Sequence, residues 1–342
     1  MTRKSGRDVF VGAGELTYVV IEGWERLPPG WSFVEVAGVA CDSRGRVYVF
    51  NRGEHPVIVF DQDGKFLSSW GEGVFARAHG ITIGPDDSLY LTDDKDHTVR
   101  RFTPDGKLLL TLGRSGQKSD TGAVGQDYRT IRRAGPPFNY PTDLAVTPEG
   151  DLLVTDGYGN ARVHRFSADG RWLHSWGEPG SGPGQFHVPH GIAVDREGTI
   201  YIADRENSRL QLFSPDGDYL REWAGLARPS EVFIDGRGFI YVAELGFRAG
   251  RWPGTGPPGP GDPGGRVSIF DRGGALLARF GGGEDPCAPG DFFAPHDLWV
   301  DSRGDLYVGE VILSAGGKHG LVPRDCHSFQ KFARKAREGG SG

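Results

Sequence analysis

The chain repeats one pattern of four short apolar segments and tight turns six times, and this repeat restricts its fold more strongly than any other feature. A complete copy has an apolar segment, a turn, a second apolar segment that ends in Asp, Asn or Glu, and two further segments joined by an Asp-Gly turn. Runs rich in Val, Ile, Tyr and Phe at this spacing are typical of β-strands. Four-stranded units of about 40 residues predict propeller blades. The copies begin near Gly38, His79, Thr142, His190, Ser230 and His296.

The two ends of the chain supply the pieces that a closed ring needs. The sixth copy lacks a fourth strand, whereas residues 16–24 (LTYVVIEGW) form a predicted strand without a blade of their own. Pairing these two segments leaves no open strand edge. The sequence therefore predicts an all-β, six-bladed β-propeller, a single domain over residues 1–342, in which the N-terminal strand completes the last blade.

The charge balance and the lack of long apolar runs exclude several classes of protein. The 342 residues include 45 Asp and Glu against 39 Lys and Arg, and this net charge of −6 argues against nucleic acid as a partner, because phosphate binding needs a basic face. No apolar run approaches the roughly 18 residues of a membrane span, and the basic residues 1–10 precede no apolar signal region. Three cysteines are too few for a disulfide framework. We therefore expect a cytoplasmic, soluble protein with no membrane partner.

One face of the predicted disc receives the long insertions. In antiparallel blades, the start of the innermost strand and the loop between the second and third strands open on the same face. The insertions that fall there cover residues 114–141 between blades 2 and 3, 247–265 in blade 5 and 311–326 in blade 6. Long connections in compact domains are commonly functional, so we expect the functional site on this face.

Histidine precedes the innermost strand in alternate blades, and only in those. The residues are His79, His190 and His296, in blades 2, 4 and 6. Alternate blades of a sixfold ring are related by about 120°, so we expect the three imidazoles to point at one spot on the axis. Three neutral imidazoles with an open fourth position are the ligands of a catalytic zinc site, and Fe²⁺ also accepts imidazole. Each histidine taken alone is compatible with a structural role.

Two arginines and a tyrosine follow the second strands of other blades and open on the same face. Arg52 (FNRGEH) and Arg205 (ADRENS) bring two cations near the predicted metal, which an anion between them would stabilise. Arginine binds carboxylates through paired hydrogen bonds, so we expect a small-molecule substrate with a carboxylate. Rim acids such as Glu54 and Glu206 are alternative partners for the arginines. Tyr158 (DGYGN) lies in the corresponding loop of blade 3 and could present its phenol to the metal.

The motifs FNRGEH, HGI, DGYGN, VPHGIAV, ADREN and PHD occur in this order along the chain. The repeats resemble those of the NHL-repeat family of β-propellers over nearly the whole chain. The motif set resembles that of peptidyl-α-hydroxyglycine α-amidating lyase, a propeller enzyme that splits an α-hydroxyglycine into an amide and glyoxylate. The resemblance implies that His79, His190 and His296 hold zinc, and that Arg52, Arg205 and Tyr158 line the substrate site. It also implies a structural calcium ion, held by the backbone carbonyls of Val39 and Ile81 and by the Asp297 carboxylate, and oxygen ligands suit this hard cation.

The chain departs from the family's pattern at several positions. Ala294 replaces a methionine two positions before the last metal histidine, and Gly159 replaces a cysteine after the tyrosine. The family's disulfides are therefore absent, which fits a reducing compartment. Cys287 and Cys326 both lie on the working face near blade 6 and could meet, while Cys41 is expected in the core.

The resemblance implies a carbon–nitrogen lyase that acts on a carbinolamide. For such a reaction a metal ion would activate the substrate hydroxyl, and Tyr158 is our candidate for the base. Two alternatives remain open. The same three histidines would serve a metal-dependent hydrolase or hydratase of the lactonase type. The chain could also be a non-catalytic binding scaffold, because fold does not imply function.

Overall fold

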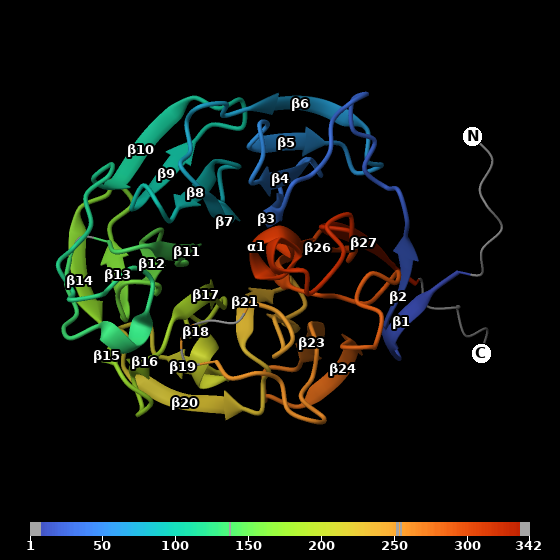
Figure 1. Cartoon of the computed structure of the whole chain (residues 1–342). Helices are drawn as coiled ribbons and strands as arrows, with labels where there is room; N and C mark the ends of the chain where they lie inside the picture. Colours follow the sequence, from blue (N-terminus) through green and yellow to red (C-terminus); the bar gives the residue numbers. More distant parts are fainter. Residues whose placement is uncertain (1–7, 137, 251–252, 254, 336–342) are drawn as a thin grey trace, which may run out of the picture.

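Six antiparallel sheets surround a central axis (Figure 1). The computed structural model describes residues 8–136, 138–250, 253 and 255–335. The remainder of the predicted domain, including the basic residues 1–7 and positions 137, 251, 252 and 254 of two predicted insertions, lies outside these described residues. The predicted fold class, an all-β propeller of six blades, is confirmed.

The first three blades follow the predicted order, with the innermost strand first. Blade 1 contains β3 (Val36–Cys41), β4 (Val47–Asn51), β5 (Val57–Phe60) and β6 (Phe66–Trp70). Blade 2 contains β7 (Ala78–Ile83), β8 (Leu89–Asp93), β9 (Thr98–Phe102) and β10 (Leu108–Gly113), followed by the 3₁₀ helix η1 (Tyr128–Thr130). Blade 3 contains β11 (Pro141–Val146), β12 (Leu152–Asp156), β13 (Arg162–Phe166) and β14 (Trp172–Trp176).

The other three blades repeat this order and carry most of the additional elements. A small parallel pair, β15 (Glu178–Pro179) and β16 (Gln185–Phe186), leads into blade 4, which contains β17 (Pro189–Val194), β18 (Ile200–Asp204), the 3₁₀ helix η2 (Arg205–Asn207), β19 (Arg209–Phe213) and β20 (Tyr219–Ala224). Blade 5 contains β21 (Pro229–Ile234), β22 (Ile240–Glu244), β23 (Arg266–Phe270) and β24 (Leu276–Gly281). Blade 6 contains β25 (Pro295–Val300), β26 (Leu306–Glu310), the helix α1 (Ile312–Ala315), the 3₁₀ helix η3 (Gly317–His319) and β27 (Phe329–Arg334).

The N-terminal strand closes the ring, as predicted. The strand β2 (Leu16–Ile21) pairs antiparallel with β27, with Tyr18 opposite Arg334. The strand ends three residues earlier than predicted, and Trp24 instead packs between the rings of Phe60 and Tyr307. A further strand, β1 (Phe10–Ala13), pairs with β2 and makes this sheet five-stranded, which the sequence did not predict.

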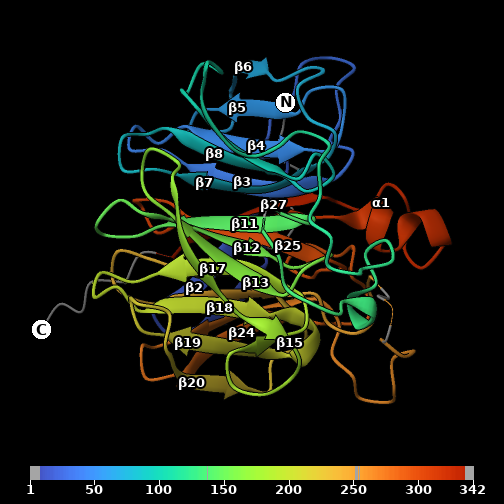
Figure 2. The same ribbon diagram turned by 90° about the vertical axis from the view of Figure 1, so that its left-hand side faces the viewer.

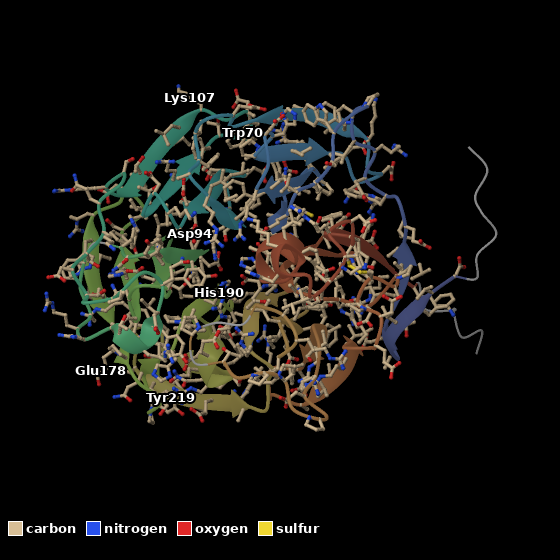
Figure 3. The ribbon with its side chains drawn as sticks, in the orientation of Figure 1. Trp70, Asp94, Lys107, Glu178, His190 and Tyr219 are labelled. Carbon is tan, nitrogen blue, oxygen red and sulfur yellow. A yellow bond between two sulfur atoms is a disulfide. The ribbon has the colours of Figure 1, made fainter. Side chains whose placement is uncertain are left out.

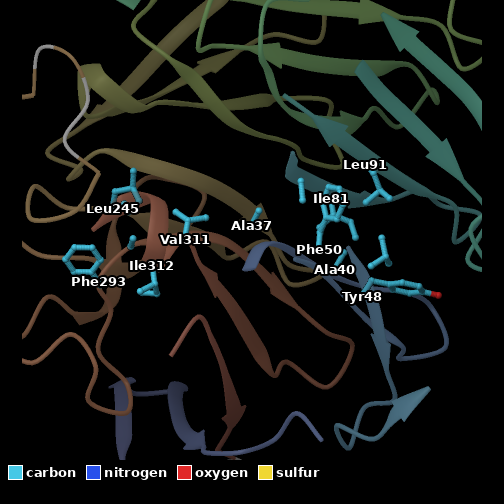
Figure 4. Close-up of a cluster of buried hydrophobic side chains, with 14 of the residues drawn as sticks. Ala37, Ala40, Tyr48, Phe50, Ile81, Leu91, Leu245, Phe293, Val311 and Ile312 are labelled. Carbon is cyan, nitrogen blue, oxygen red and sulfur yellow. The ribbon is translucent and has the colours of Figure 1, made fainter. Parts of the chain in front are cut away.

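The apolar core lies between neighbouring blades. In one cluster, side chains of blade 1 such as Phe50 pack against Ile81 and Leu91 of blade 2 (Figure 4). Burial of these inward faces is the main stabilising contribution to such a ring. The tight turns between the outer strands need residues with positive φ; at Gly64, φ is 82°, and a Cβ atom would lie 1.9 Å from the Trp24 carbonyl oxygen.

The insertions lie on the face predicted to carry the site. The helix α1 belongs to the 311–326 insertion and projects from one face of the disc (Figure 2). The opposite face is formed by short turns between the first and second strands of each blade. Among the described residues, no helix is long and apolar enough to cross a membrane.

A disulfide joins two segments of this rim. Cys287 and Cys326 are bonded, with their Cα atoms 5.2 Å apart, and the bond ties the 311–326 insertion to the crossover before blade 6. The sequence left this pairing open, because neither residue belongs to the repeat. Cys41 is a buried free cysteine in the core, as predicted. Disulfides persist mainly in oxidising compartments, so the bond does not support the argument for a reducing compartment, and the cytoplasmic localisation stays a prediction.

Candidate active site

Three buried imidazoles meet at the axis of the ring. His79, His190 and His296 are each the second residue of an innermost strand, in β7, β17 and β25. Their candidate ligand nitrogens all lie within 4.8 Å of one another. Figure 3 shows His190 close to the axis, whereas Tyr219 and Glu178 lie at the outer edge. The alternation of histidine around the repeat therefore corresponds to a real cluster.

Each of these imidazoles is held by the blade that follows it in the ring. Nδ1 of His79 lies 2.7 Å from the Thr142 carbonyl oxygen, and Nδ1 of His190 lies 2.6 Å from that of Ser230. Nδ1 of His296 lies 2.7 Å from the Ala37 carbonyl oxygen, so the pattern continues across the point where the ring closes. A carbonyl oxygen only accepts hydrogen bonds, so Nδ1 carries the proton in all three rings.

This tautomer leaves three Nε2 lone pairs facing one another. The Tyr158 hydroxyl oxygen lies 3.0 Å from Nε2 of His79 and 3.0 Å from Nε2 of His190, but its single proton can be donated to only one of them. Nε2 of His296 is buried and has no hydrogen-bond partner among the described residues. Buried acceptors without donors are costly, and a cation at this point would satisfy all three. The donor set therefore fits a transition metal such as zinc.

The surroundings also keep the imidazoles neutral. Burial, together with the neighbouring histidines and Arg52, holds the pKa of His79 well below its ordinary value. Burial and Arg205 have the same effect on the pKa of His190, and burial and Arg52 on that of His296. Neutral imidazoles are the form that ligates metals.

In blades that carry a histidine, the acid that ends the second strand positions the segment that leads to the histidine. The Asp93 carboxylate accepts hydrogen bonds from the backbone N–H groups of Ala76 and Arg77, just before His79. Glu310 accepts from Phe293 and Ala294 in the same way before His296. The carboxylates of these strand-ending acids are therefore occupied by hydrogen bonds from the backbone that leads to each histidine.

Arg52, Arg205 and Tyr158 are placed by a second set of backbone contacts. The N–H of Arg52 donates to the Glu35 carbonyl at 2.8 Å, and that of Arg205 donates to the Val188 carbonyl at 3.1 Å. Val188 has a φ of 61°, which is strained for a β-branched residue and turns its carbonyl toward Arg205. The N–H of Tyr158 donates to the Tyr140 carbonyl at 3.4 Å. These contacts place all three predicted side chains on the histidine face.

The three side chains line a cavity of 420 Å³ that also includes His296. The cavity has two chemically different sides. One carries guanidinium groups, from Arg52, Arg77 and Arg205. The other comes from blades 5 and 6 and is mainly apolar, with Leu245, Val311, Ala315 and Leu321 beside Ser314 and His319. A ligand with a carboxylate at one end and an apolar group at the other matches this division.

Arg52 is buried and only partly satisfied. Its Nε donates to the Ala78 carbonyl at 2.8 Å and its Nη1 to Glu35 Oε2 at 3.0 Å, whereas its Nη2 has no hydrogen-bond partner among the described residues. Burial and the nearby Arg77 lower the pKa of this guanidinium. Arg205 donates to Glu206 Oε1 at 2.8 Å and to the Tyr158 hydroxyl at 3.2 Å, and it lies over the Tyr158 ring.

The sequence reasoning missed Arg77 and the acid that holds it. Arg77 Nη1 donates to Asp94 Oδ2 at 2.9 Å, and the Asp94 side chain is fully buried. Arg77 lies two positions before His79, and Glu35 lies two positions before the matching Ala37 of blade 1. Aligning this position across the blades, as was done for the histidines, would have revealed both residues.

The residues of the predicted calcium site lie next to one another, one layer below the histidines. Asp297 Oδ2 lies 3.4 Å from the Val39 nitrogen, and a Cβ atom at Gly38 would lie 2.8 Å from that oxygen and 2.6 Å from the Ile81 side chain. Glycine at position 38 therefore lets the Asp297 carboxylate and Ile81 approach the backbone of β3 closely, and carboxylate and carbonyl oxygens are ligands that suit Ca²⁺.

Two further carboxylates, which the sequence reasoning missed, lie in the same layer. Asp143, Glu231 and Asp297 all line a 530 Å³ cavity at the other end of the axis. Burial raises the pKa of all three carboxyls, and Asp143 raises those of Glu231 and Asp297 further. Three neighbouring carboxyls would bind a cation more favourably than the single carboxylate that the sequence predicted.

The departures at Ala294 and Gly159 have local structural counterparts. Ala294 is buried and packs with Phe293 and Val311. At Gly159 a Cβ atom would lie 2.4 Å from the Asn139 side-chain oxygen. Asn139 instead binds Ser119 and Thr121 of the 114–141 insertion, so this loop takes the space that a larger residue at 159 would need.

The chain is similar in sequence to a known repeat family and to several known proteins. The NHL repeat family matches residues 138–166 and 186–213. NHL repeat-containing protein 3 from Homo sapiens is 33% identical, over 68% of this chain and 68% of that protein. Peptidyl-alpha-hydroxyglycine alpha-amidating lyase 1 from Drosophila melanogaster is 36% identical, over 72% of this chain and 45% of that protein.

Longer relatives and solved structures are also similar. Peptidylglycine alpha-amidating monooxygenase from Rattus norvegicus is 31% identical over 87% of this chain, which spans only 32% of that protein. A gluconolactonase structure from Xanthomonas campestris superposes with a TM-score of 0.61 at 15% identity, over 97% of this chain and 99% of that one, and shows the fold alone. On these similarities and its own repeats, the chain belongs to the NHL-repeat family of six-bladed β-propellers and resembles the peptidyl-α-hydroxyglycine α-amidating lyases within it.

Proposed function

We propose that this protein is a metal-dependent carbon–nitrogen lyase that cleaves a carbinolamide with a carboxylate into an amide and glyoxylate or a related carbonyl product. The observation that carries the proposal is the set of three Nε2 lone pairs that converge next to Tyr158, Arg52 and Arg205. Relatives named as amidating lyases support the same reaction class.

His79, His190 and His296 would hold the metal through Nε2, with the Nδ1 contacts to neighbouring blades fixing each ring. A divalent ion such as Zn²⁺ or Fe²⁺ bound there supplies Lewis-acid activation of the substrate hydroxyl. Asp297, with the carbonyls of Val39 and Ile81, would hold Ca²⁺ in the layer below and stabilise the centre of the ring.

Arg52 and Arg205 bind and orient the substrate carboxylate. Arg52 Nη2 is a buried donor that needs an acceptor, and a carboxylate between the guanidiniums provides one. The apolar wall at Leu245, Val311 and Leu321 then receives the acyl group on the amide nitrogen. These contacts place the carbinol carbon near the histidines and Tyr158.

Tyr158 is the proposed base. Its oxygen accepts a hydrogen bond from Arg205 Nη1 at 3.2 Å, which holds it beside the histidines. Acting as the phenolate, Tyr158 takes the substrate hydroxyl proton, the hydroxyl oxygen becomes the carbonyl oxygen of the product, and the carbon–nitrogen bond breaks with its electron pair on nitrogen. Tyr158 then returns this proton to the nitrogen, which leaves as the amide, and the phenolate is restored. No oxidant or reductant is needed.

The test combines metal content with turnover. We expect near-stoichiometric transition metal, its loss in the variant His79→Gln/His190→Gln/His296→Gln, and release of glyoxylate from α-hydroxyhippurate by the metal-loaded protein. Hydrolysis of lactones without glyoxylate release would instead favour the hydrolase alternative. A protein that takes up no transition metal after reconstitution would leave only a binding scaffold.

A further inference from the structure

Each of the three arginines that line the cavity contacts one buried acid, and each of these acids also contacts one of the three insertions. The three acids are Glu35, Asp94 and Glu206, and their side chains are at most 3% exposed. The repeat places the arginines, whereas the insertions lie outside it. Each acid therefore links one insertion to one arginine of the cavity.

The contact in blade 1 is the tightest of the three. Glu35 Oε2 accepts from Arg52 Nη1 at 3.0 Å and from the Ser314 hydroxyl at 2.7 Å, while Glu35 Oε1 accepts from the Ser314 backbone N–H at 2.6 Å. Arg52 Nη1 also donates to the Ser314 hydroxyl oxygen at 3.2 Å. Ser314 belongs to α1, so Glu35 holds the 311–326 insertion and Arg52 together.

The contact in blade 4 has the same form. Glu206 Oε1 accepts from Arg205 Nε at 2.8 Å, and Glu206 Oε2 accepts from the Thr255 hydroxyl of the 247–265 insertion at 2.8 Å. Arg228 binds both Glu206 oxygens and also donates to the carbonyls of Ala249 and Gly250 at 2.9 and 2.8 Å. A buried network of this kind holds its members in one arrangement.

Blade 2 has a contact of the same kind, with a longer hydrogen bond to its insertion. Asp94 Oδ2 accepts from Arg77 Nη1 at 2.9 Å and from Gln126 Nε2 of the 114–141 insertion at 3.5 Å. Each insertion therefore contacts a carboxylate that also binds an arginine of the cavity, and in blade 1 Ser314 additionally contacts Arg52 directly.

We propose that Glu35, Asp94 and Glu206 are positioning residues that couple the three insertions to Arg52, Arg77 and Arg205, so that docking of the insertions and binding of a carboxylate in the cavity stabilise each other. The proposal rests on the proposed function only for the identity of the ligand. Coupling between two binding events is reciprocal. A ligand carboxylate on Arg52 stabilises the docked α1 segment, and loss of docking lowers the affinity of the cavity for the carboxylate.

The 311–326 insertion offers a direct readout, because Lys318 and Arg324 are exposed sites for trypsin. Hippurate carries the carboxylate and an apolar acyl group but lacks the hydroxyl, so it binds without reacting. In the metal-loaded wild-type protein we expect saturating hippurate to slow trypsin cleavage in this insertion at least threefold.

Two variants separate the coupling from a simple loss of structure. Glu35→Gln removes the charge that both partners share; we expect KM for α-hydroxyhippurate to rise about tenfold, kcat to change less than threefold, and the protection by hippurate to disappear. Ser314→Ala leaves the ion pair between Arg52 and Glu35 and the backbone hydrogen bond from residue 314 to Glu35, and removes only the two contacts of the serine hydroxyl. We expect smaller changes in the same direction from it, and the weaker protection by hippurate is the part that a role of Glu35 confined to Arg52 would not produce.

Matched controls complete the experiment. Glu72→Gln removes an exposed acid that, in the described part of the chain, is hydrogen-bonded to His55 and Ser69 on the outer side of blade 1, and we expect wild-type KM and protection. Thr255→Ala tests the blade 4 contact if Glu35→Gln fails to fold. Wild-type KM and protection in both Ser314→Ala and Thr255→Ala, in a protein that releases glyoxylate, would overturn the coupling alone. A wild-type protein that neither binds hippurate nor releases glyoxylate would overturn the proposed function and this coupling with it.

Discussion

The hydroxyl oxygen of Tyr158 lies 3.0 Å from Nε2 of His190, at the point where the histidine cluster opens into the cavity. The same oxygen lies 3.0 Å from Nε2 of His79. A phenol in this position touches both the predicted metal ligands and the space for the substrate. It is therefore the side chain whose hydroxyl should matter most directly for the chemistry.

The variant Tyr158→Phe should lose turnover while keeping its metal. We expect kcat for α-hydroxyhippurate to fall at least about 100-fold, the size typical of a lost general base. Metal content should stay near the wild-type value, because no histidine is changed. Tyr219→Phe, on the outer strand β20 (Figure 3), is the matched control and should keep full activity. Full activity in Tyr158→Phe would remove this residue from the mechanism.

The three histidines should make the metal-free protein less stable in mild acid. Their pKa values are lowered in the folded state by burial and neighbouring cations, so the unfolded chain takes up protons first as pH falls below about 6.5. The free energy of unfolding should then fall with pH, by up to about 1.4 kcal/mol per pH unit for each histidine.

Urea denaturation between pH 5 and 7 measures this effect. Buried acids such as Asp143, whose pKa is raised, contribute a slope of opposite sign in both proteins. The difference between the wild type and the triple His→Gln variant therefore isolates the histidines. Equal slopes in the two proteins would show that the imidazoles are not held neutral.

Calcium should stabilise the ring through Asp297. A ligand present at 100 times its Kd adds about 2.7 kcal/mol to the stability of the state that binds it. We expect Ca²⁺ to raise Tm of chelator-treated protein by a few degrees, and Asp297→Asn to abolish the shift. Asp285→Asn, on the rim, should respond like the wild type. An unchanged Tm on addition of Ca²⁺ would argue that the acidic layer holds no such ion.

The disulfide between Cys287 and Cys326 should stabilise the 311–326 insertion. Under denaturing conditions without reductant, thiol labelling should modify only Cys41, and all three cysteines after reduction. The free energy of unfolding of the variant Cys287→Ser/Cys326→Ser should be lower than that of the wild type by about 2–4 kcal/mol, which is typical for loss of a native disulfide. Labelling of three thiols in freshly purified, unreduced protein would show that the bond does not form.

The regular repeat made the fold and the histidine cluster predictable from the sequence. Each copy of the repeat turns the chain by one blade, so a position counted within the copy becomes an angle around the axis. This is why His79, His190 and His296 could be expected to converge although more than 200 residues separate the first from the last. The same counting would have found Arg77 and Glu35, which occupy one equivalent position in blades 2 and 1.

The sequence by itself thus determined the ring, its closure by the N-terminal strand and the face on which the side chains meet, because periodic burial of apolar residues leaves one way to stack such units. Only the tertiary structure decided which proton each imidazole carries, since this depends on the carbonyl of a neighbouring blade, as between His296 and Ala37. It also decided how the insertions attach. The insertions are not part of the repeat, so their positions around the axis cannot be counted from the sequence. Contacts such as that between Glu35 and Ser314 arise only when segments 279 residues apart have packed against each other.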